Sequence, residues 1–408
     1  MNDLQIFTSI RWSKLRYYGT SSLKNGIIKE FMIYQLRTRF LVKLSFIFNL
    51  FAAIFTNQLA YGQVDFQKTI QQIPKSSKFT DPGYYVWCGT MTQGDDGKYY
   101  LFYSRWPQKE GFKGWVTHSE IALAVSDKVT GQFKPMKVIL GPRTKGFWDS
   151  DVTHNPNIQK FDGKYYLYYM GNYGNGEWWD HRNHQRIGVA VATSPLGPWQ
   201  RFDKPVVDVS VDKWDHLMTS NPTVCKGKNG QYLLMYKGVG NGEMPFGGKV
   251  LHGVAFSNSP IGPFVKSPNP IFQKEGVKFP AEDPFVWYQK NKYLAIVKDM
   301  HSVFIESPKD PVLNKINTHP DSLSKAFENK ASLVLFESSN GIDWKLAKKP
   351  LVSKSKLIWE DGSVQQVQLL DRPQLYIEKG EPKVLLCAVK VSEDETFNVS
   401  IPLATIKK

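Results

Sequence analysis

The sequence predicts an all-β fold, specifically a five-bladed β-propeller. Three kinds of strand-like segment recur in a fixed order, at intervals of roughly 60 to 90 residues. Each set supplies four short strands, and the repeat region shows no sustained 3.6-residue hydrophobic period. Four antiparallel strands per repeat are typical of a propeller blade. A β-sandwich with chance similarity between its hairpins is the alternative, which the fixed order of three elements disfavours.

The first recurring segment is a strand rich in Tyr and Leu that follows a turn. Its copies lie at 94–104, 161–170, 228–238, 289–299 and 378–389. Five copies of one strand indicate five blades.

The second recurring segment precedes the first by about ten residues and begins with a polar residue followed by proline. Its copies lie at 81–87, 155–159, 221–225, 283–287 and 372–376. Proline has no N–H for a sheet ladder, so it belongs on an edge strand or at the first residue of a strand. The residue before it is pushed towards extended geometry. We therefore expect five edge strands that begin in the same way.

The third recurring segment is a strand, a turn of Ser, Gly and Pro, and an aromatic residue that opens a fourth strand. Its copies lie at 121–133, 187–199, 252–264 and 331–344, and 398–406 supplies the equivalent strand of the fifth blade. Residues 300–330 are polar and do not fit the repeat, which predicts an insertion in blade four.

The N-terminal part predicts export. An apolar run at 44–55 follows basic residues and precedes Ala60-Tyr61-Gly62, with small residues where a signal peptidase cleaves. The run is shorter than the ~20 residues that span a bilayer. We expect a leader over 1–62 that starts at Met32 and a single catalytic domain over 63–408. The mature protein is then periplasmic or secreted, with no membrane partner once the leader is removed.

Charge and cysteine content limit the classes of partner. The net charge is +15, but residues 63–408 hold no Lys/Arg run of the nucleic-acid type, so no nucleic-acid partner is expected. The three cysteines are too few for a disulfide framework. None has metal-ligand spacing, so we expect no metal and no required cofactor, and a divalent cation in the central channel is not indicated. The oligomeric state is left open.

The proline-marked strands predict where a site would form. The innermost strands of a propeller line its channel, so their openings meet at one mouth. We expect the following residues there: Thr80, Asp81, His154, Asn155, Ser220, Asn221, Glu282, Asp283, Asp371 and Arg372. Strand alternation predicts that only one of Glu282 and Asp283 faces the channel strongly. Two carboxylic acids on different blades suit glycoside hydrolysis, in which one protonates the leaving oxygen and the other activates water or attacks carbon.

Over residues 78–408 the chain resembles the five-bladed propeller glycoside hydrolases, the superfamily of families 43, 32, 62, 68 and 117. Those enzymes carry a base or nucleophile in an Asp-Pro of blade one, a tuning Asp two blades on, and a Glu-x-Pro acid one blade later. Asp81-Pro82 fits the first place, and Glu282-Asp283-Pro284 fits the last. The resemblance thus implies a base at Asp81 and an acid at Glu282.

The middle place departs from the family pattern, because Asn221-Pro222 stands where an Asp-Pro is expected. Asp215 could take the tuning role, or Asp149 or Asp151 could do so from blade two, and sequence order favours Asp215. Asp149 is the alternative base if Asp81 faces away from the channel. His154 is a second candidate acid, since family 117 is associated with a histidine in that role.

Aromatic and basic residues near the mouth are candidates for binding sugar. Trp87 and Trp106, with Trp178, Trp179 and Trp287, are available as platforms for sugar rings. The other substrate-binding candidates are Arg105, Asn155, Asn221, Lys237, Asp283, Lys298 and Arg372. Four cations near one opening favour a carboxylated or sulfated sugar, because Arg and Lys pair with such anions.

The function expected is that of an exported glycoside hydrolase acting on a plant or algal polysaccharide or oligosaccharide. We expect the enzyme to be exo-acting, and the resemblance implies inversion. Two alternatives stay open: a glycoside phosphorylase, which would use phosphate as nucleophile, and a carbohydrate-binding propeller without catalysis.

Overall fold

The computed structural model describes residues 32–36, 38, 65–305 and 332–404. The chain divides between Gly62 and Gln63, and only the second unit is described further. The apolar run at 44–55 lies outside the described residues, as does the part of the blade-four insertion from 306 onward. Among the residues described, no helix is both long and apolar enough to span a membrane.

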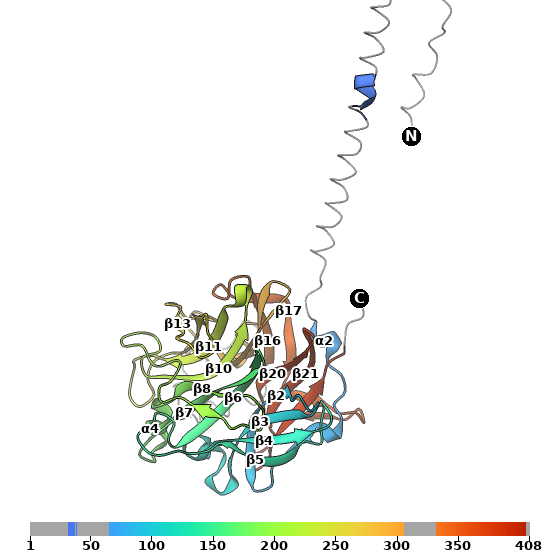
Figure 1. Ribbon diagram of the computed structural model, residues 1–408. Helices are drawn as coiled ribbons and strands as arrows, with labels where there is room; N and C mark the ends of the chain where they lie inside the picture. The colour runs from blue at the N-terminus through green and yellow to red at the C-terminus, as the bar shows by residue number, and fades with distance from the viewer. Residues whose placement is uncertain (1–31, 37, 39–64, 306–331, 405–408) are drawn as a thin grey trace, which may run out of the picture. The chain divides into compact units, whose positions relative to one another are not determined.

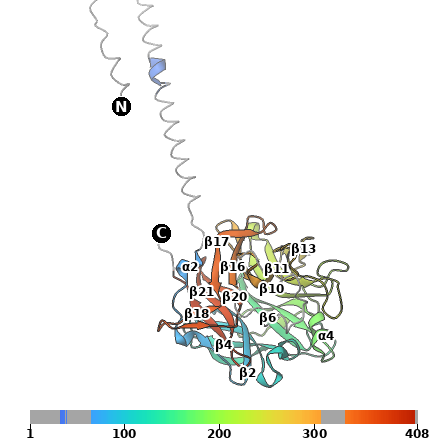
Figure 2. The ribbon, with the colours of Figure 1, turned by 180° about the vertical axis from the view of Figure 1, so that it is seen from behind.

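Five four-stranded antiparallel sheets make up the second unit, and they form the five-bladed propeller expected from the sequence (Figures 1 and 2). Blade one holds β2 (Tyr84–Gln93), β3 (Tyr99–Pro107), β4 (Glu120–Ser126) and β5 (Lys134–Leu140). Blade two holds β6 (Val152–Phe161), β7 (Lys164–Asn172), β8 (Arg186–Ala192) and β9 (Gln200–Arg201). Blade three holds β10 (Met218–Lys226), β11 (Tyr232–Val239), β12 (Val250–Ser257) and β13 (Val265–Lys266). Blade four holds β14 (Ala281–Gln289), β15 (Lys292–Asp299), β16 (Ser332–Ser338) and β17 (Lys345–Lys354).

The fifth blade is built from both ends of the domain. β20 (Leu369–Glu378), β21 (Glu381–Lys390) and β22 (Thr396–Pro402) are its first three strands, which confirms the expected strand near 398–406. Its outer strand is β1 (Lys78–Phe79), which pairs with β22 through Lys78 opposite Val399. The sequence repeat did not predict this strand, because β1 is only two residues long and belongs to no copy of the repeat.

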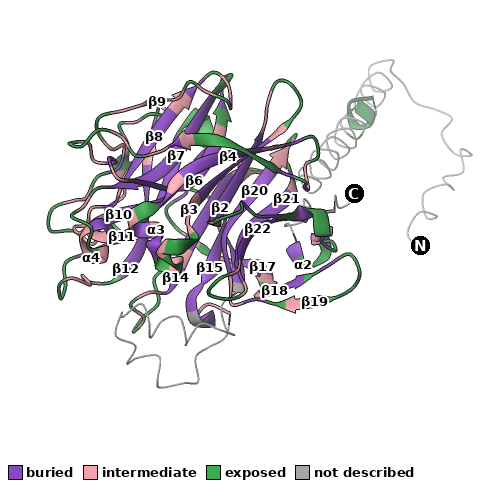
Figure 3. Ribbon diagram, turned by 90° about the horizontal axis from the view of Figure 1, so that it is seen from below, coloured by how far each residue is buried: buried purple, intermediate pink, exposed green. Residues whose placement is uncertain are grey.

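The remaining elements are short and lie in the connections. The α-helices are α2 (Phe66–Thr69), α3 (Trp115–His118) and α4 (Trp178–Asn183). The 3₁₀ turns are Lys75–Ser77, Gln108–Glu110, Phe112–Gly114, Lys228–Gly230 and Met300–Ser302, and β18 (Lys356–Ile358) pairs with β19 (Val364–Gln366). Figure 3 shows that the blade strands are mostly buried while the connecting loops are exposed.

A bulge interrupts each inner strand at the repeated position. The pairing with the second strand shifts there, and the residue at the bulge has φ between 51° and 57°. These residues are Cys88, Asn155, Asn221, Asp283 and Arg372. Cys88 is followed by Gly89, and each of the other four is followed by a proline. The inner strands are edge strands, as predicted. The proline, however, lies within the strand and not at its start.

This register corrects the alignment of blade one. The structural equivalent of Asn155-Pro156 is Cys88-Gly89, whereas the sequence pattern predicted Asp81-Pro82 there. Asp81-Pro82 lies before the inner strand, in the turn that leads into β2. A bulge needs a residue with positive φ and an interrupted ladder, and glycine serves as well as proline at the next position.

Substitution of Phe79 tests how much β1 contributes to stability. Phe79 is 3% exposed, with its ring 4.8 Å from that of Tyr103. We expect Phe79→Ala to lower the free energy of unfolding by about 3–5 kcal/mol, because it leaves a cavity where β1 joins blade five. Lys78→Ala, which removes an exposed ion pair with Glu395, should cost under about 1 kcal/mol. Equal losses of unfolding free energy for the two variants, measured by urea denaturation, would contradict this role of β1.

Candidate functional site

A cavity of about 660 Å³ lies where the five inner strands converge. Each blade contributes to its lining, through Trp87, His154, Asn221, Glu282 and Arg372 in sequence order. The convergence expected at one mouth is therefore present, with the blade-one contribution coming from the β2 bulge region.

The bulge brings two consecutive side chains of one strand to the cavity. Glu282 and Asp283 both line it, as do His154 with Asn155, and Asp371 with Arg372. Strand alternation had predicted only one of Glu282 and Asp283 there. At a bulge two residues oppose one on the neighbouring strand, so the ordinary alternation of side chains is lost.

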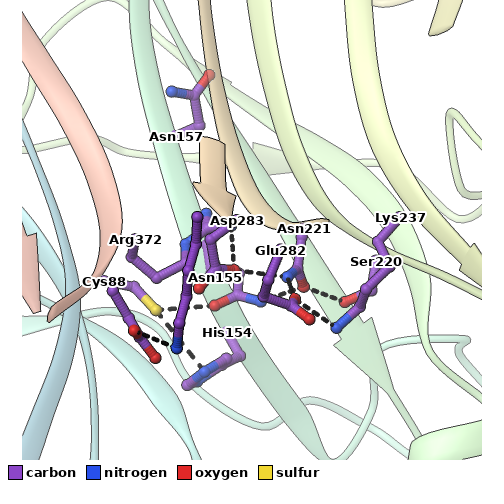
Figure 4. A network of polar contacts seen from close by, with 12 residues as sticks. Cys88, His154, Asn155, Asn157, Ser220, Asn221, Lys237, Glu282, Asp283 and Arg372 are labelled. Atoms are coloured by element: carbon purple, nitrogen blue, oxygen red, sulfur yellow. Dashed lines mark hydrogen bonds and ion pairs between the residues drawn. The ribbon is translucent and has the colours of Figure 1, made fainter. Parts of the chain in front are cut away.

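Asn221 lies at the centre of a hydrogen-bonded network that joins three blades (Figure 4). Its Oδ1 accepts hydrogen bonds from Asn155 Nδ2 (2.6 Å) and Ser220 Oγ (2.7 Å). Its Nδ2 donates to Glu282 Oε1 (2.5 Å) and to Asp283 Oδ1 (2.7 Å). One amide group therefore holds both carboxylates.

Four carboxylates line the cavity, and each forms an ion pair with a cation that also lines it. Lys237 Nζ lies 2.8 Å from Glu282 Oε1, and Lys298 Nζ lies 2.5 Å from Asp371 Oδ1. Arg372 Nη1 lies 3.3 Å from Asp283 Oδ1, and Lys390 Nζ lies 2.5 Å from Glu393 Oε1. Lys237, Lys298 and Arg372 were predicted to bind substrate, and the structure places them on the cavity but already paired.

Burial gives two of these carboxylic acids an unusual protonation equilibrium. It raises the pKa of Asp283, an effect that the neighbouring charge of Glu282 reinforces and that of Arg372 opposes. Burial also raises the pKa of Asp371, against the opposing charge of Lys298. Burial therefore shifts the pKa of both carboxyl groups upward, while their ion pairs with Arg372 and Lys298 act in the opposite direction.

His154 lines the cavity as a neutral ring. Burial lowers its pKa well below the ordinary range, and the positive charge of Arg372 adds to the effect. Nδ1 lies 2.7 Å from Ser119 Oγ, and the ring stacks on Trp115 at 5.0 Å. A histidine with a lowered pKa is a poor proton donor at neutral pH, so the geometry does not favour the predicted acid role.

The aromatic residues predicted as platforms divide into three groups. Trp87 and Trp106 line the cavity, but they are 7% and 1% exposed and pack among aromatic neighbours. Trp178 and Trp179 line it and are partly exposed. Trp287 is buried in a core cluster and does not line the cavity. The helix α4 therefore offers the accessible ring faces.

The predicted base Asp81 and the predicted ligand Arg105 lie outside the cavity lining. Asp81 Oδ2 accepts hydrogen bonds from Tyr103 Oη (2.6 Å) and from Arg105 Nη1 (2.8 Å). Arg105 also pairs with Glu120 at 2.9 Å. These contacts hold β3 to the segment before β2, so we do not assign either residue to the site.

Asp149 and Asp215 occupy the places equivalent to Asp81 in blades two and three, and they too lie outside the lining. Asp149 accepts from Tyr169 Oη at 2.7 Å, and Asp215 accepts from Tyr236 Oη at 2.9 Å. Arg143 pairs with Asp149, and Lys266 pairs with Asp215, both at 2.5 Å. The three aspartates form a repeated clamp between Asp, Tyr and a cation, which is a structural part of blades one, two and three.

Six polar residues on the cavity were not predicted from the sequence: Lys113, Arg182, Gln185, Gln368, Lys390 and Glu393. Arg182, in α4, and Gln185, just after it, line the cavity beside Trp179. Burial lowers the pKa of Arg182 to about 10, and the negative charge of Glu282 acts in the opposite direction. The dipeptide Trp178-Trp179 was the signal for this segment. The segment lies between the second and third strands of blade two and is not part of the inner-strand repeat.

Neither metal ligands nor paired cysteines are found in the described parts of the protein. No group of three or more His, Cys, Asp and Glu side chains there is arranged to hold a metal ion. Cys88, Cys225 and Cys387 are free and buried. Burial raises the pKa of Cys88, whose thiol donates to Asn155 Oδ1 at 2.8 Å.

Comparisons with known proteins agree with this architecture. No family model matches the sequence. A solved complex of BT0996 with RGII has a TM-score of 0.58 at 14% identity, over 83% of this protein and 93% of that one. A family 117 glycoside hydrolase of Zobellia galactanivorans, Zg3597, has a TM-score of 0.52 at 17% identity, over 83% and 91%. A thermostable family 43 glycoside hydrolase has a TM-score of 0.53 at 12% identity, over 81% and 94%. The fold is that of the propeller glycoside hydrolases.

One curated relative shares sequence as well. The extracellular endo-α-(1→5)-L-arabinanase 2 of Bacillus subtilis (strain 168) is 27% identical over 202 residues. That stretch is 47% of this protein and 39% of the arabinanase, so the match spans less than half of either one. The resemblance stated from the sequence is thus confirmed at the level of the fold.

The blade register extends the departure from the family pattern. Cys88-Gly89, and not Asp81-Pro82, occupies the inner-strand position of blade one, and Asn221-Pro222 occupies that of blade three. Both positions that the resemblance assigns to aspartates therefore lack a carboxylate here. Only the Glu-x-Pro of blade four matches the pattern in both sequence and place.

The clamp role of Asp149 can be tested by its effect on stability. We expect Asp149→Asn to lower the free energy of unfolding by about 3 kcal/mol or more, because it leaves Arg143 without its buried partner. Asp203 also faces Arg143, at 3.7 Å, but is 81% exposed. Asp203→Asn should change stability by less than about 0.5 kcal/mol in the same denaturant titration. A stable Asp149→Asn variant with lost ligand binding would instead place Asp149 in the site.

Proposed function

We propose that the protein is an exported glycoside hydrolase acting on a plant or algal oligosaccharide. The observation that carries the proposal is the convergence of Glu282, Asp283 and Asp371 in one cavity that also presents the rings of Trp178 and Trp179. Two carboxyl groups, one to donate a proton and one to act as base or nucleophile, and apolar faces for sugar rings are what glycosidic cleavage needs. The fold comparisons and the arabinanase match support the same class of reaction.

The proton donor and the ionised partner are assigned from their surroundings. Asp371 is the proposed donor, because burial raises its pKa and it lies on a different blade from Glu282. Glu282, held by the Lys237 ammonium, is the proposed ionised carboxylate that activates water or attacks carbon. This reverses the acid role that the family resemblance implied for Glu282.

Asp283 is the less suitable partner for Glu282. Their nearest oxygens are 2.7 Å and 2.5 Å from the same Asn221 nitrogen. They therefore cannot lie as far apart as the ~6.5–9.5 Å that an inverting pair needs to accommodate water. The inverting outcome that we expect from the family resemblance thus requires Asp371 as the second carboxyl group.

Buried polar side chains outside the cavity lining connect the inner strands of three blades. Asn157 Nδ2 donates to Gln374 Oε1 at 2.8 Å, and both residues are buried, with 0% and 1% exposure. Thr90 Oγ1 lies 3.4 Å from the same oxygen. These side chains join blades one, two and five, and exo-action stays a prediction from the sequence. The basic, apolar leader segment supports export.

A carbohydrate-binding propeller without catalysis is the second candidate. Cys88 and Asn221 occupy two inner-strand positions where the resembled enzymes carry aspartates. Such a protein would bind oligosaccharides without turning them over. The measurement of turnover described next separates the two candidates.

Substitution of the two proposed catalytic carboxyls should abolish most turnover. We expect Glu282→Gln and Asp371→Asn each to lower kcat at least about 100-fold on natural oligosaccharides, as loss of a general acid or base does. On an aryl glycoside with a good leaving group, the kcat of Asp371→Asn should recover, since cleavage of that bond needs little protonation of the leaving oxygen. Glu275→Gln, an exposed change outside the cavity, is the control. If the kcat of Glu282→Gln on the aryl glycoside recovered and that of Asp371→Asn did not, Glu282 would be the acid.

The pH dependence of kcat should follow Asp371. Since burial raises its pKa, the protonated donor persists above the ordinary Asp range, and the rate should fall as pH rises through the raised value. Asp371→Asn should remove this alkaline limb from the residual activity. An unchanged limb in that variant would mean that another group donates the proton.

A further inference from the structure

The charge lining the cavity is unequal. Six cationic side chains and four carboxylates line it. All four carboxylates are already paired with cations of the same cavity: Lys237, Lys298, Arg372 and Lys390. Arg182 belongs to the excess of positive charge. Three of the four cations predicted from the sequence to recognise an anion, Lys237, Lys298 and Arg372, thus already have a carboxylate partner in the cavity, and the arginine of α4 was not predicted.

Arg182 has no ion pair with any carboxylate of the described residues. Its Nη1 donates to Asn183 Oδ1 (2.9 Å) and to the Phe246 carbonyl oxygen (3.2 Å), which fixes one side of the guanidinium. The guanidinium lies over the Trp179 ring, 5.5 Å from its centroid. Within the described part of the protein, Nε and Nη2 have no hydrogen-bond acceptor, so the fork that would bind an oxyanion in bidentate fashion is open.

Gln185 presents a second open donor in the same turn. Its backbone N–H donates to the Arg182 carbonyl oxygen at 3.4 Å, so the two residues are neighbours. Gln185 is 1% exposed and lines the cavity, yet its Nε2 has no partner among the residues described. A buried amide that lacks a hydrogen bond is destabilising, and a ligand oxygen would relieve this.

We propose that Arg182 and Gln185 form a subsite for an anionic group of a saccharide, a carboxylate or a sulfate. Arg182 supplies charge and a planar fork, Gln185 supplies a neutral donor, and Trp179 supplies the apolar face next to them. The inference rests on the proposed function for the saccharide class, but it concerns recognition and not bond cleavage. It makes the substrate a charged oligosaccharide, bound through residues that are not part of the inner-strand repeat.

Calorimetric titration of the full-length protein with matched saccharides tests the subsite. The probes are a galacturonate tetrasaccharide with its carboxyl-reduced counterpart, and a sulfated galactan tetrasaccharide with its desulfated counterpart. The wild type should bind one charged member at least about tenfold more tightly than its neutral match, and the pair that shows this preference identifies the anion. Arg182→Gln should lose most of the preference without weakening the neutral ligand comparably.

Two further variants keep the result interpretable. Lys274→Gln removes the same charge from an exposed position outside the cavity and should keep the preference. Arg182→Lys keeps the charge without the fork and should retain part of the preference for the charged saccharide. This variant still tests the subsite if Arg182→Gln fails to fold. Equal affinity of the wild type for charged and neutral members would overturn the subsite, as would a preference that survives in Arg182→Gln.

The outcomes for recognition and for catalysis are separable. Turnover of a neutral oligosaccharide without any charge preference would refute the subsite and leave the hydrolase intact. Selective binding of the charged saccharide without turnover would support the subsite and refute the hydrolase. Turnover that depends strictly on inorganic phosphate, with phosphate binding lost in Arg182→Gln, would assign the subsite to a phosphate nucleophile and overturn its role in recognising the saccharide.

Discussion

A residue held at positive φ inside each inner strand is the constraint on which the site depends. Such a conformation costs an L-amino acid roughly 1–2 kcal/mol and persists only where the surroundings fix it. Here five such residues face one axis, and all of them are buried. In blades two, four and five the bulge turns two consecutive side chains of the strand to the cavity, so these strands supply more polar groups than regular strands would. The crowded network around Asn221 follows from this geometry.

The same constraint explains what could be predicted from the sequence. The blade repeat was visible because Tyr-rich strands and proline-marked strands recur, and four of the five inner-strand positions were placed correctly. Blade one was placed wrongly, since Asp81-Pro82 looks like the repeated dipeptide while Cys88-Gly89 does not. What recurs physically is a backbone conformation, and dissimilar residue pairs can adopt it. The two-residue strand β1 left no repeat signal.

The candidate site was predictable in position but less so in chemistry. Glu282, Asn221 and Arg372 belong to the repeat and were found, whereas Arg182 and Gln185 come from a loop that no periodicity marks. Ion pairing between blades was not visible either. Lys298 and Asp371 are far apart in sequence, and only the closed ring brings them within 2.5 Å. Residues that look like substrate ligands in the sequence can therefore form ion pairs with one another in the folded protein.

The pairing of β1 with β22 has a consequence for the order of assembly. Blades one to four are each continuous in the sequence and can pair their strands locally, but blade five needs segments from opposite ends of the domain. Closing so long a loop carries the largest entropic cost of any strand pairing in the molecule. Arg372 and Asp371 reach the cavity only from this blade. A partly assembled protein in which β1 has not yet paired could thus have β20 to β22 in place, but would leave β22 as an unpaired edge and the ring open between blades five and one.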